Sequence, residues 1–174
     1  MSVLPPISEL NTASRDGFLV AVNTLFEVAP PLGDHLYAGR PYSSYGELID
    51  RAQALIQSDK LTREEKIEVI NAHPRIGEHP ANLSALSLKE QGYQERTVSP
   101  QEQQVNRTLA KLNENYEARY GFKFVVFVNG RPRTEIIKVI GQRLATDNVD
   151  EELTTGLTDM MAIARDRLNK LGRQ

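Results

Sequence analysis

Helix-start signals recur along the whole chain, and they constrain the fold more than any other feature of the sequence. A serine or threonine followed three residues later by glutamate is typical of a capping box, in which each side chain bonds the backbone amide of the other residue. This pattern, or its asparagine equivalent, begins at Ser44, Thr62, Ser87, Ser99 and Asn148. Apolar residues at helical spacing follow most of these signals. The sequence therefore predicts an all-α protein.

The predicted helices cover most of the chain, and at 174 residues the chain fits a single domain of ordinary size, residues 1–174. Residues 1–13 contain a double proline and little periodicity, so we expect them to form an N-terminal arm or loop. We therefore predict one compact multi-helix domain. Its helices are expected at 15–28, 32–37, behind Ser44, from Thr62 to His73, at 87–96, from Ser99 to about Tyr120, at 134–145 and at 149–171.

One segment breaks the helical pattern. Residues 122–128, FKFVVFV, have the composition of a strand and are bounded by Gly121 and by Asn129-Gly130. A single strand has no partner in an all-α fold, so we expect one short extended, buried segment between helices. Its backbone amides must then be satisfied by side chains, waters or a ligand.

Composition excludes several classes of protein. With Lys+Arg 21 against Asp+Glu 23, the net charge of -2 gives no basic field for nucleic acid. No apolar run is long enough to cross a membrane. The N-terminus, MSVLPPISEL, lacks the pattern of a secretory signal, so we expect a cytoplasmic protein. The absence of cysteine excludes disulfides and thiolate chemistry, and His35, His73 and His79 are the only imidazoles.

The stretch from Asn71 to Gln91 concentrates the groups that can carry chemistry. His73 is expected in the last turn of a helix that Pro74 ends, where unpaired carbonyls favour the imidazolium form and the following loop gives a substrate access. An acid–base role is therefore consistent with this position. The commoner role of such a histidine is simply to cap the helix carbonyls, and position alone leaves both roles open.

A second cluster follows across the loop. Ser87 and Glu90 form a capping-box pattern and could be purely structural, but Gln91 adds an amide beside them. A hydroxyl, a carboxylate and an amide at one helix entrance could bind a small polar ring through several donors and acceptors. Arg167, near the end of the last predicted helix, could bind a planar anion or only complement the helix dipole.

His73, Glu78 and His79 lie close enough in sequence to suggest a metal site. The usual zinc motif on a helix needs two histidines one turn apart. Pro74, Gly77 and Pro80 break any helix between these residues, so we expect no metal there.

Four separated motifs resemble one known family. The segments HPRIG at 73–77, SLKEQ at 87–91 and YGFKFVVFV at 120–128, with the closing RL at 167–168, resemble in order and spacing the decarboxylases of 2-oxo-4-hydroxy-4-carboxy-5-ureidoimidazoline (OHCU). These enzymes form (S)-allantoin in urate breakdown, and the resemblance spans about residues 14–171. It implies an all-helical homodimer that binds a small ureidoimidazoline and decarboxylates it without a metal or an organic cofactor.

The resemblance also implies a set of site residues. The family's catalytic histidine corresponds to His73, and its second catalytic group to Glu90. Arg165 is the alternative to Arg167 for the family's arginine. The implied substrate contacts are Pro74, Ser87, Leu88, Lys89, Gln91, Phe124, Val125, Val126, Phe127, Val128 and Arg167.

The chain departs from the commonest family pattern at two places. Arg75-Ile76-Gly77 stands where many members have aspartate and leucine-alanine-glycine, and Gly92-Tyr93 replaces a pair of small residues. Two rival functions stay open at this point. The first is a non-catalytic helical module for ligand binding or protein interaction, and the second is a metal hydrolase built on the histidines.

Overall fold

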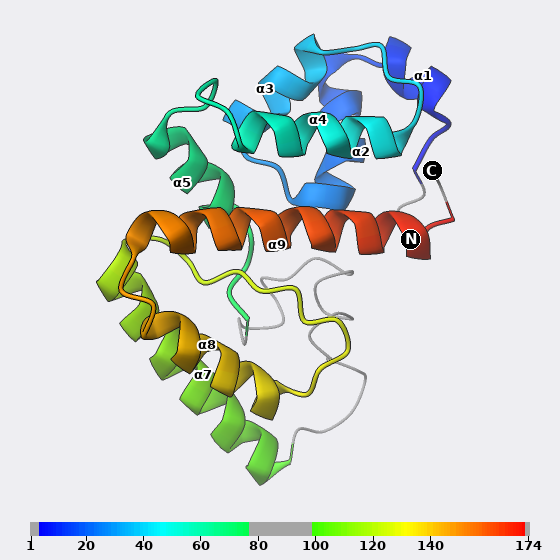
Figure 1. Cartoon of the computed structure of the whole chain (residues 1–174). Coiled ribbons are helices and arrows are strands. Elements are labelled where there is room, and N and C mark those ends of the chain that lie inside the picture. The colour runs from blue at the N-terminus through cyan, green and yellow to red at the C-terminus, as the bar shows by residue number, and fades with distance from the viewer. Residues whose placement is uncertain (1–3, 77–98, 173–174) are drawn as a thin grey trace. The chain divides into compact units, whose positions relative to one another are not determined.

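The computed structural model describes residues 4–76 and 99–172. Within these two ranges the regular structure is helical and no β-strand occurs (Figure 1). The helices are α1 (Ile7–Thr12), α2 (Arg15–Phe26), α3 (Pro30–Ala38), α4 (Tyr45–Ile56), α5 (Arg63–Asn71), α7 (Pro100–Tyr120), α8 (Arg133–Leu144) and α9 (Val149–Lys170). The all-α prediction is confirmed. None of these helices is long and apolar enough to cross a membrane.

The chain forms two compact units. Unit 1 comprises Met1–His73 and Leu157–Gln174, and unit 2 comprises Pro74–Gly156. Unit 2 is therefore inserted into the sequence of unit 1, and the second boundary falls inside α9, which contributes residues to both. The expectation of one folding domain stays a prediction.

Capping residues set the starts of five helices, and four of them are positions that the sequence predicts. A side-chain oxygen accepts an amide hydrogen three residues further along at Ser14, Ser44, Thr62, Ser99 and Asn148. At Thr62 the capping box is complete, because a glutamate three residues on accepts from the backbone amide of Thr62. These bonds satisfy amides that have no partner within the helix.

The expectation that residues 1–13 form an arm or loop is wrong for residues 7–12, which are helical. The segment is held by long-range contacts: the amide of Asn11 donates to the Tyr42 carbonyl at 2.8 Å, and the Tyr45 hydroxyl donates to the Pro5 carbonyl at 2.6 Å. Leu10 is fully buried. A helix of six residues is too short to show a periodic pattern, so its tertiary partners decide its structure.

The helix expected at 15–28 ends earlier, at Phe26, and the next helix begins earlier than expected. Pro30 and Pro31 occupy the first turn of α3, where a missing N–H costs nothing. Glu27 closes α2 in the left-handed conformation, with φ 49° and ψ 56°.

Aliphatic and phenylalanine side chains from most helices fill the core of unit 1. Fully buried members include Phe18, Leu25, Phe26, Leu36, Leu48, Ile49, Ile70 and Met160. This core holds the ends of α2, α5 and α9 in fixed positions, and those ends carry the candidate site.

In unit 2, α7 and α8 run parallel. Arg133 at the start of α8 donates to Asn106 near the start of α7 at 2.6 Å, and Tyr120 at the end of α7 donates to the Leu144 carbonyl at the end of α8 at 3.1 Å. Consecutive parallel helices require a chain that returns along the length of the second helix. The 12 residues of α8 rise about 18 Å, and residues 123–128 reach up to about 20 Å when extended.

The extended segment predicted from FKFVVFV is therefore the return crossing, and it needs no strand partner. Figure 1 shows it as the yellow trace that links the end of α7 to the start of α8. Aromatic rings anchor its start: Tyr116 lies 4.7 Å from Tyr120 and 5.3 Å from Phe124, measured between ring centroids. Such tilted and edge-to-face pairs add to the burial energy of the rings.

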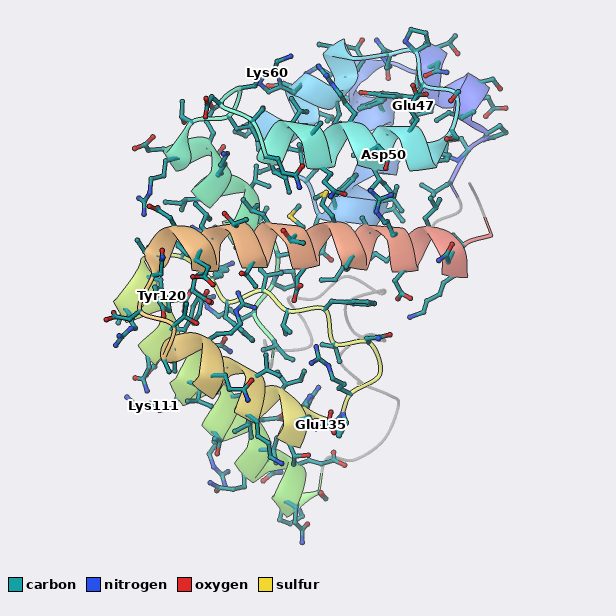
Figure 2. All side chains as sticks on the ribbon, in the orientation of Figure 1. Glu47, Asp50, Lys60, Lys111, Tyr120 and Glu135 are labelled. Carbon is teal, nitrogen blue, oxygen red and sulfur yellow. The ribbon has the colours of Figure 1, made fainter. Side chains whose placement is uncertain are left out.

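Acid stability depends in part on Glu47 at the start of α4 (Figure 2). The backbone amide and the hydroxyl of Ser43 donate to its carboxylate and hold the pKa of Glu47 below its ordinary value of 4.5. A lowered folded-state pKa contributes stability above pH 4.5, and this contribution is lost as the pH falls through the folded pKa. We expect Glu47→Gln to be less stable than wild type at pH 7, with the difference shrinking below about pH 4.5.

Urea unfolding at several pH values between 7 and 3 measures this difference. Glu68→Gln, at an exposed position of α5, corrects for the general effect of removing a negative charge. A difference that stays constant with pH would contradict the assignment to Glu47.

Candidate active site

His73 lies buried just beyond the end of α5. The helix ends at Asn71, two residues before the predicted end. The amides of Ala72 and His73 bond to the carbonyls of Val69 and Ile70, which tightens the last turn. Pro74 disfavours the helical conformation at the residue before it, which explains the early end. The imidazole is consequently held at a helix C-terminus, as expected.

An acidic group, Glu27, lies close to this imidazole, and the sequence alone does not predict it. Its Oε2 lies 3.6 Å from His73 Nδ1, and the two side chains are 11% and 5% exposed. The sequence gives no local signal for this contact, because the two residues follow the ends of different helices of unit 1. A carboxylate beside an imidazole favours its protonated form.

Arg167 brings a third charged group to the same place. Its guanidinium is buried, and Nη1 donates to the carbonyls of Thr24 at 3.2 Å and Leu25 at 3.4 Å. Nη2 lies 3.5 Å from Glu27 Oε1. Arg167 therefore does complement a helix dipole, but at the C-terminus of α2 rather than on its own helix.

Arg165, the alternative to Arg167, lies elsewhere. Its guanidinium donates to Asp50 and to Gln53, each at 2.8 Å, and its side chain is 41% exposed. Of the two arginines, Arg167 shares a carboxylate with His73.

The residues after His73 are fixed on α7 within unit 2. Pro74 is half-buried. The Arg75 guanidinium binds the Glu117 carboxylate at 2.8–3.0 Å, and the Asn113 amide donates to the Ile76 carbonyl at 2.8 Å. Arg75 and Ile76, which depart from the commonest family pattern, are thus bonded to Glu117 and Asn113 of α7 in this chain.

Arginines hold the carbonyls of the extended segment Phe124–Val128. Arg143 Nη1 donates to Val125 at 2.9 Å, and Arg131 donates to Phe127 at 2.6 Å and to Val128 at 3.1 Å. Among residues 4–76 and 99–172, no acceptor takes the amide hydrogens of Val125 and Val126. The backbone amides of Val125 and Val126 are therefore available as hydrogen-bond donors, in a segment whose position is fixed by the bonds of the two arginines to its carbonyls.

A buried network positions Arg143. Its Nε lies 2.7 Å from Glu152 Oε1, which also accepts from the Tyr116 hydroxyl at 2.9 Å. Burial raises the pKa of the Tyr116 hydroxyl, so this hydroxyl stays protonated and can donate. The network satisfies both buried charges and thereby stabilises the crossing segment.

Several predicted site residues lie outside the described residues. They are Ser87, Leu88, Lys89, Glu90 and Gln91, together with the helix expected at 87–96 and with Glu78 and His79 of the weighed metal site. In the part of the chain that the structure describes, no three His, Cys, Asp or Glu side chains gather as metal ligands.

The fold is similar to that of solved structures. A crystal structure of OHCU decarboxylase in the presence of (S)-allantoin superposes with a TM-score of 0.67 and 21% identity, covering 91% of this chain and 98% of that one. A crystal structure of (S)-allantoin synthase gives a TM-score of 0.61 with 15% identity, covering 96% of this chain and 54% of that one. At these identities the similarity establishes the fold alone.

Sequence comparison identifies the family. The model of the OHCU decarboxylase family matches residues 11–169, and the chain belongs to this family. A 2-oxo-4-hydroxy-4-carboxy-5-ureidoimidazoline decarboxylase of Haloferax volcanii is 25% identical over 162 residues, which are 93% of each chain. A uric acid degradation bifunctional protein of Bacillus sp. (strain TB-90) is 28% identical over 97% of this chain. The chain spans 32% of the length of that relative and of a second one from Bacillus subtilis.

The Arg143–Glu152 pair predicts a specific pattern of stability. Arg143→Met leaves the Glu152 carboxylate buried without its charge partner, which should lower the unfolding free energy by about 3–5 kcal/mol. Replacing both residues with methionine removes both charges and should recover much of that loss. Urea unfolding of the single and double variants measures the coupling, with Arg131→Met as a control arginine on the same segment. A double variant as unstable as Arg143→Met would contradict this assignment.

Proposed function

We propose that this chain decarboxylates OHCU to (S)-allantoin, with His73 as the acid–base group. The observation that carries the proposal is a buried histidine, with a carboxylate 3.6 Å from its Nδ1, in a chain that matches the OHCU decarboxylase family over residues 11–169. Relatives from Haloferax volcanii and Xenopus laevis, matched over 93% and 91% of their own length, carry the name of this decarboxylase.

The substrate supplies most of the chemistry. The bond to its carboxylate breaks, carbon dioxide leaves, and the electron pair moves into the conjugated C=N of the ring, whose nitrogen takes up a proton from solvent. Because the ring accepts these electrons, the reaction needs no pyridoxal- or thiamine-type sink, and the proposal includes no cofactor. The protein has to orient the ring, exclude water and move protons.

His73 is assigned the proton transfers. It takes the proton of the ring hydroxyl as the product carbonyl forms, and it delivers a proton to one face of the ring carbon. Delivery from one fixed side explains a single enantiomer. Glu90 is the second catalytic group and holds His73 or the substrate in register, as the family resemblance implies.

The remaining predicted residues are assigned to substrate binding. Ser87, Leu88, Lys89 and Gln91 belong to the motif around Glu90. In the segment Phe124–Val128, the amide hydrogens of Val125 and Val126 support contacts to ring or ureido oxygens. Pro74 and Arg167 complete the set, and the burial of Arg167 beside Glu27 supports its choice over Arg165.

The proposal also includes a homodimer and a cytoplasmic location. The homodimer rests on the family resemblance, and analytical ultracentrifugation of the purified chain tests it. Fractionation of cells that express the full chain tests the location.

Replacing His73 tests the acid–base assignment. His73→Asn keeps a polar side chain but cannot transfer protons, so turnover should fall by at least about a hundredfold while binding of an allantoin-like ligand persists. The substrate is generated in situ from urate with the two upstream enzymes, and circular dichroism follows the formation of one enantiomer. His35→Asn, on α3, is the matched control. Retained turnover in His73→Asn would refute the assignment, and optically inactive background with wild type would favour the non-catalytic module.

Replacing each arginine tests the choice between them. Arg167→Lys keeps the charge but loses the planar fork. A hydrogen bond to a charged group contributes about 1.5–3 kcal/mol, so KM should rise about tenfold or more. Arg165→Lys, at the exposed position, should leave KM unchanged. The same circular dichroism assay gives both constants, and the reverse pattern would move the substrate contact to Arg165.

A further inference from the structure

Glu27 occupies a backbone conformation that disfavours glutamate. Among the described residues, three non-glycine residues have positive φ: Glu27, Asn129 and Asp147. Asparagine and aspartate tolerate the left-handed region, whereas glutamate has no such preference. The chain uses glycine for the same purpose at the end of α7, where Gly121 has φ 83°. Contacts of the glutamate side chain must therefore offset the conformational cost at this position.

The surroundings of Glu27 would also destabilise its carboxylate if no positive charge lay nearby. The side chain is 11% exposed and belongs to the residue that caps the C-terminus of α2, which carries a partial negative charge. Arg167 compensates for both effects, because it bonds the last carbonyls of α2 and approaches Glu27 Oε1 to 3.5 Å.

The two carboxylate oxygens of Glu27 have different neighbours. Oε1 faces Arg167 Nη2, and Oε2 faces His73 Nδ1 at 3.6 Å. Arg167 is anchored on α2, so it fixes the carboxylate, and the carboxylate in turn fixes the imidazole. All three residues belong to unit 1.

We infer that Glu27 is a positioning residue for His73. It holds the imidazole in one orientation and keeps a proton on Nδ1, which leaves Nε2 as the nitrogen that exchanges protons with the substrate. A protonated Nδ1 is attracted to Oε2, whereas a bare lone pair on Nδ1 would be repelled by it. The 3.6 Å separation makes this coupling electrostatic rather than a formed hydrogen bond. The role of Glu27 in turnover rests on the proposed decarboxylation, whereas the Nδ1–H tautomer of His73 does not depend on it.

The first test needs no variant of Glu27. The chain contains three histidines, so ¹⁵N-labelled histidine gives few ring signals, and His73→Asn identifies those of His73. Above about pH 8, where an ordinary imidazole is neutral, the ¹⁵N shifts report which nitrogen carries the proton. We expect the Nδ1–H tautomer, and an Nε2–H tautomer would overturn the inference.

The second test separates the charge of Glu27 from its shape. Glu27→Gln keeps the size and a hydrogen-bonding amide but removes the carboxylate. We expect kcat to fall about tenfold or more with KM nearly unchanged, and the His73 ring ¹⁵N shifts to move. Glu68→Gln, an exposed glutamate on the helix that leads to His73, should change neither. Unchanged kcat and unchanged shifts in Glu27→Gln would overturn the inference.

Failure of this inference differs from failure of the proposed function. A wild-type chain that forms no optically active allantoin refutes the decarboxylation, and the tautomer of His73 still decides whether Glu27 positions it. An active wild type with the Nε2–H tautomer refutes only the role of Glu27. If Glu27→Gln does not fold, the ¹⁵N spectrum of the wild type alone decides whether Glu27 keeps the proton on Nδ1 of His73.

Discussion

A buried guanidinium at the C-terminus of α2 organises the part of the structure that carries His73. Arg167 bonds the carbonyls of Thr24 and Leu25, residues about 140 positions away in the sequence. This contact joins the last helix to the second one and supplies positive charge where the α2 dipole is negative. The carboxylate of Glu27 therefore has a positive charge beside it as well as an imidazole. Without Arg167, the end of α2 would expose unpaired carbonyls and an uncompensated buried carboxylate.

Unit 2 depends on a different constraint, the parallel direction of α7 and α8. Two consecutive antiparallel helices need only a short turn, but a parallel pair needs a crossing as long as the second helix. An extended chain that is paired with no strand must find partners for its polar groups. Here Arg131 and Arg143 supply donors for the carbonyls of Val125, Phe127 and Val128. The arginines thus supply hydrogen-bond donors that a neighbouring strand would otherwise supply along one edge of the segment.

Local chemistry decided which features could be predicted from sequence. Capping residues such as Ser44 and Thr62 bond to amides three residues away, so the sequence predicts these helix starts, and the composition of residues 122–128 predicts the extended segment. The helix at residues 7–12 and the contact of Glu27 with His73 depend on partners far along the chain, and one sequence carries no signal of them. The roles of Glu90 and its neighbours, which lie outside the described residues, stay predictions. Family resemblance identified His73 and Arg167, but their shared carboxylate emerged only from the fold.

The insertion of unit 2 into the sequence of unit 1 has a consequence for synthesis on the ribosome. Residues up to His73 emerge first, but α9 supplies Arg167 only after the whole of unit 2 has been made. Throughout that interval the end of α2 lacks its guanidinium, and Glu27 has no positive charge from this source. The charged surroundings of His73 are therefore among the last features to form. A nascent chain stalled before Arg167 would contain His73 and Glu27 but not yet the guanidinium that bonds the end of α2.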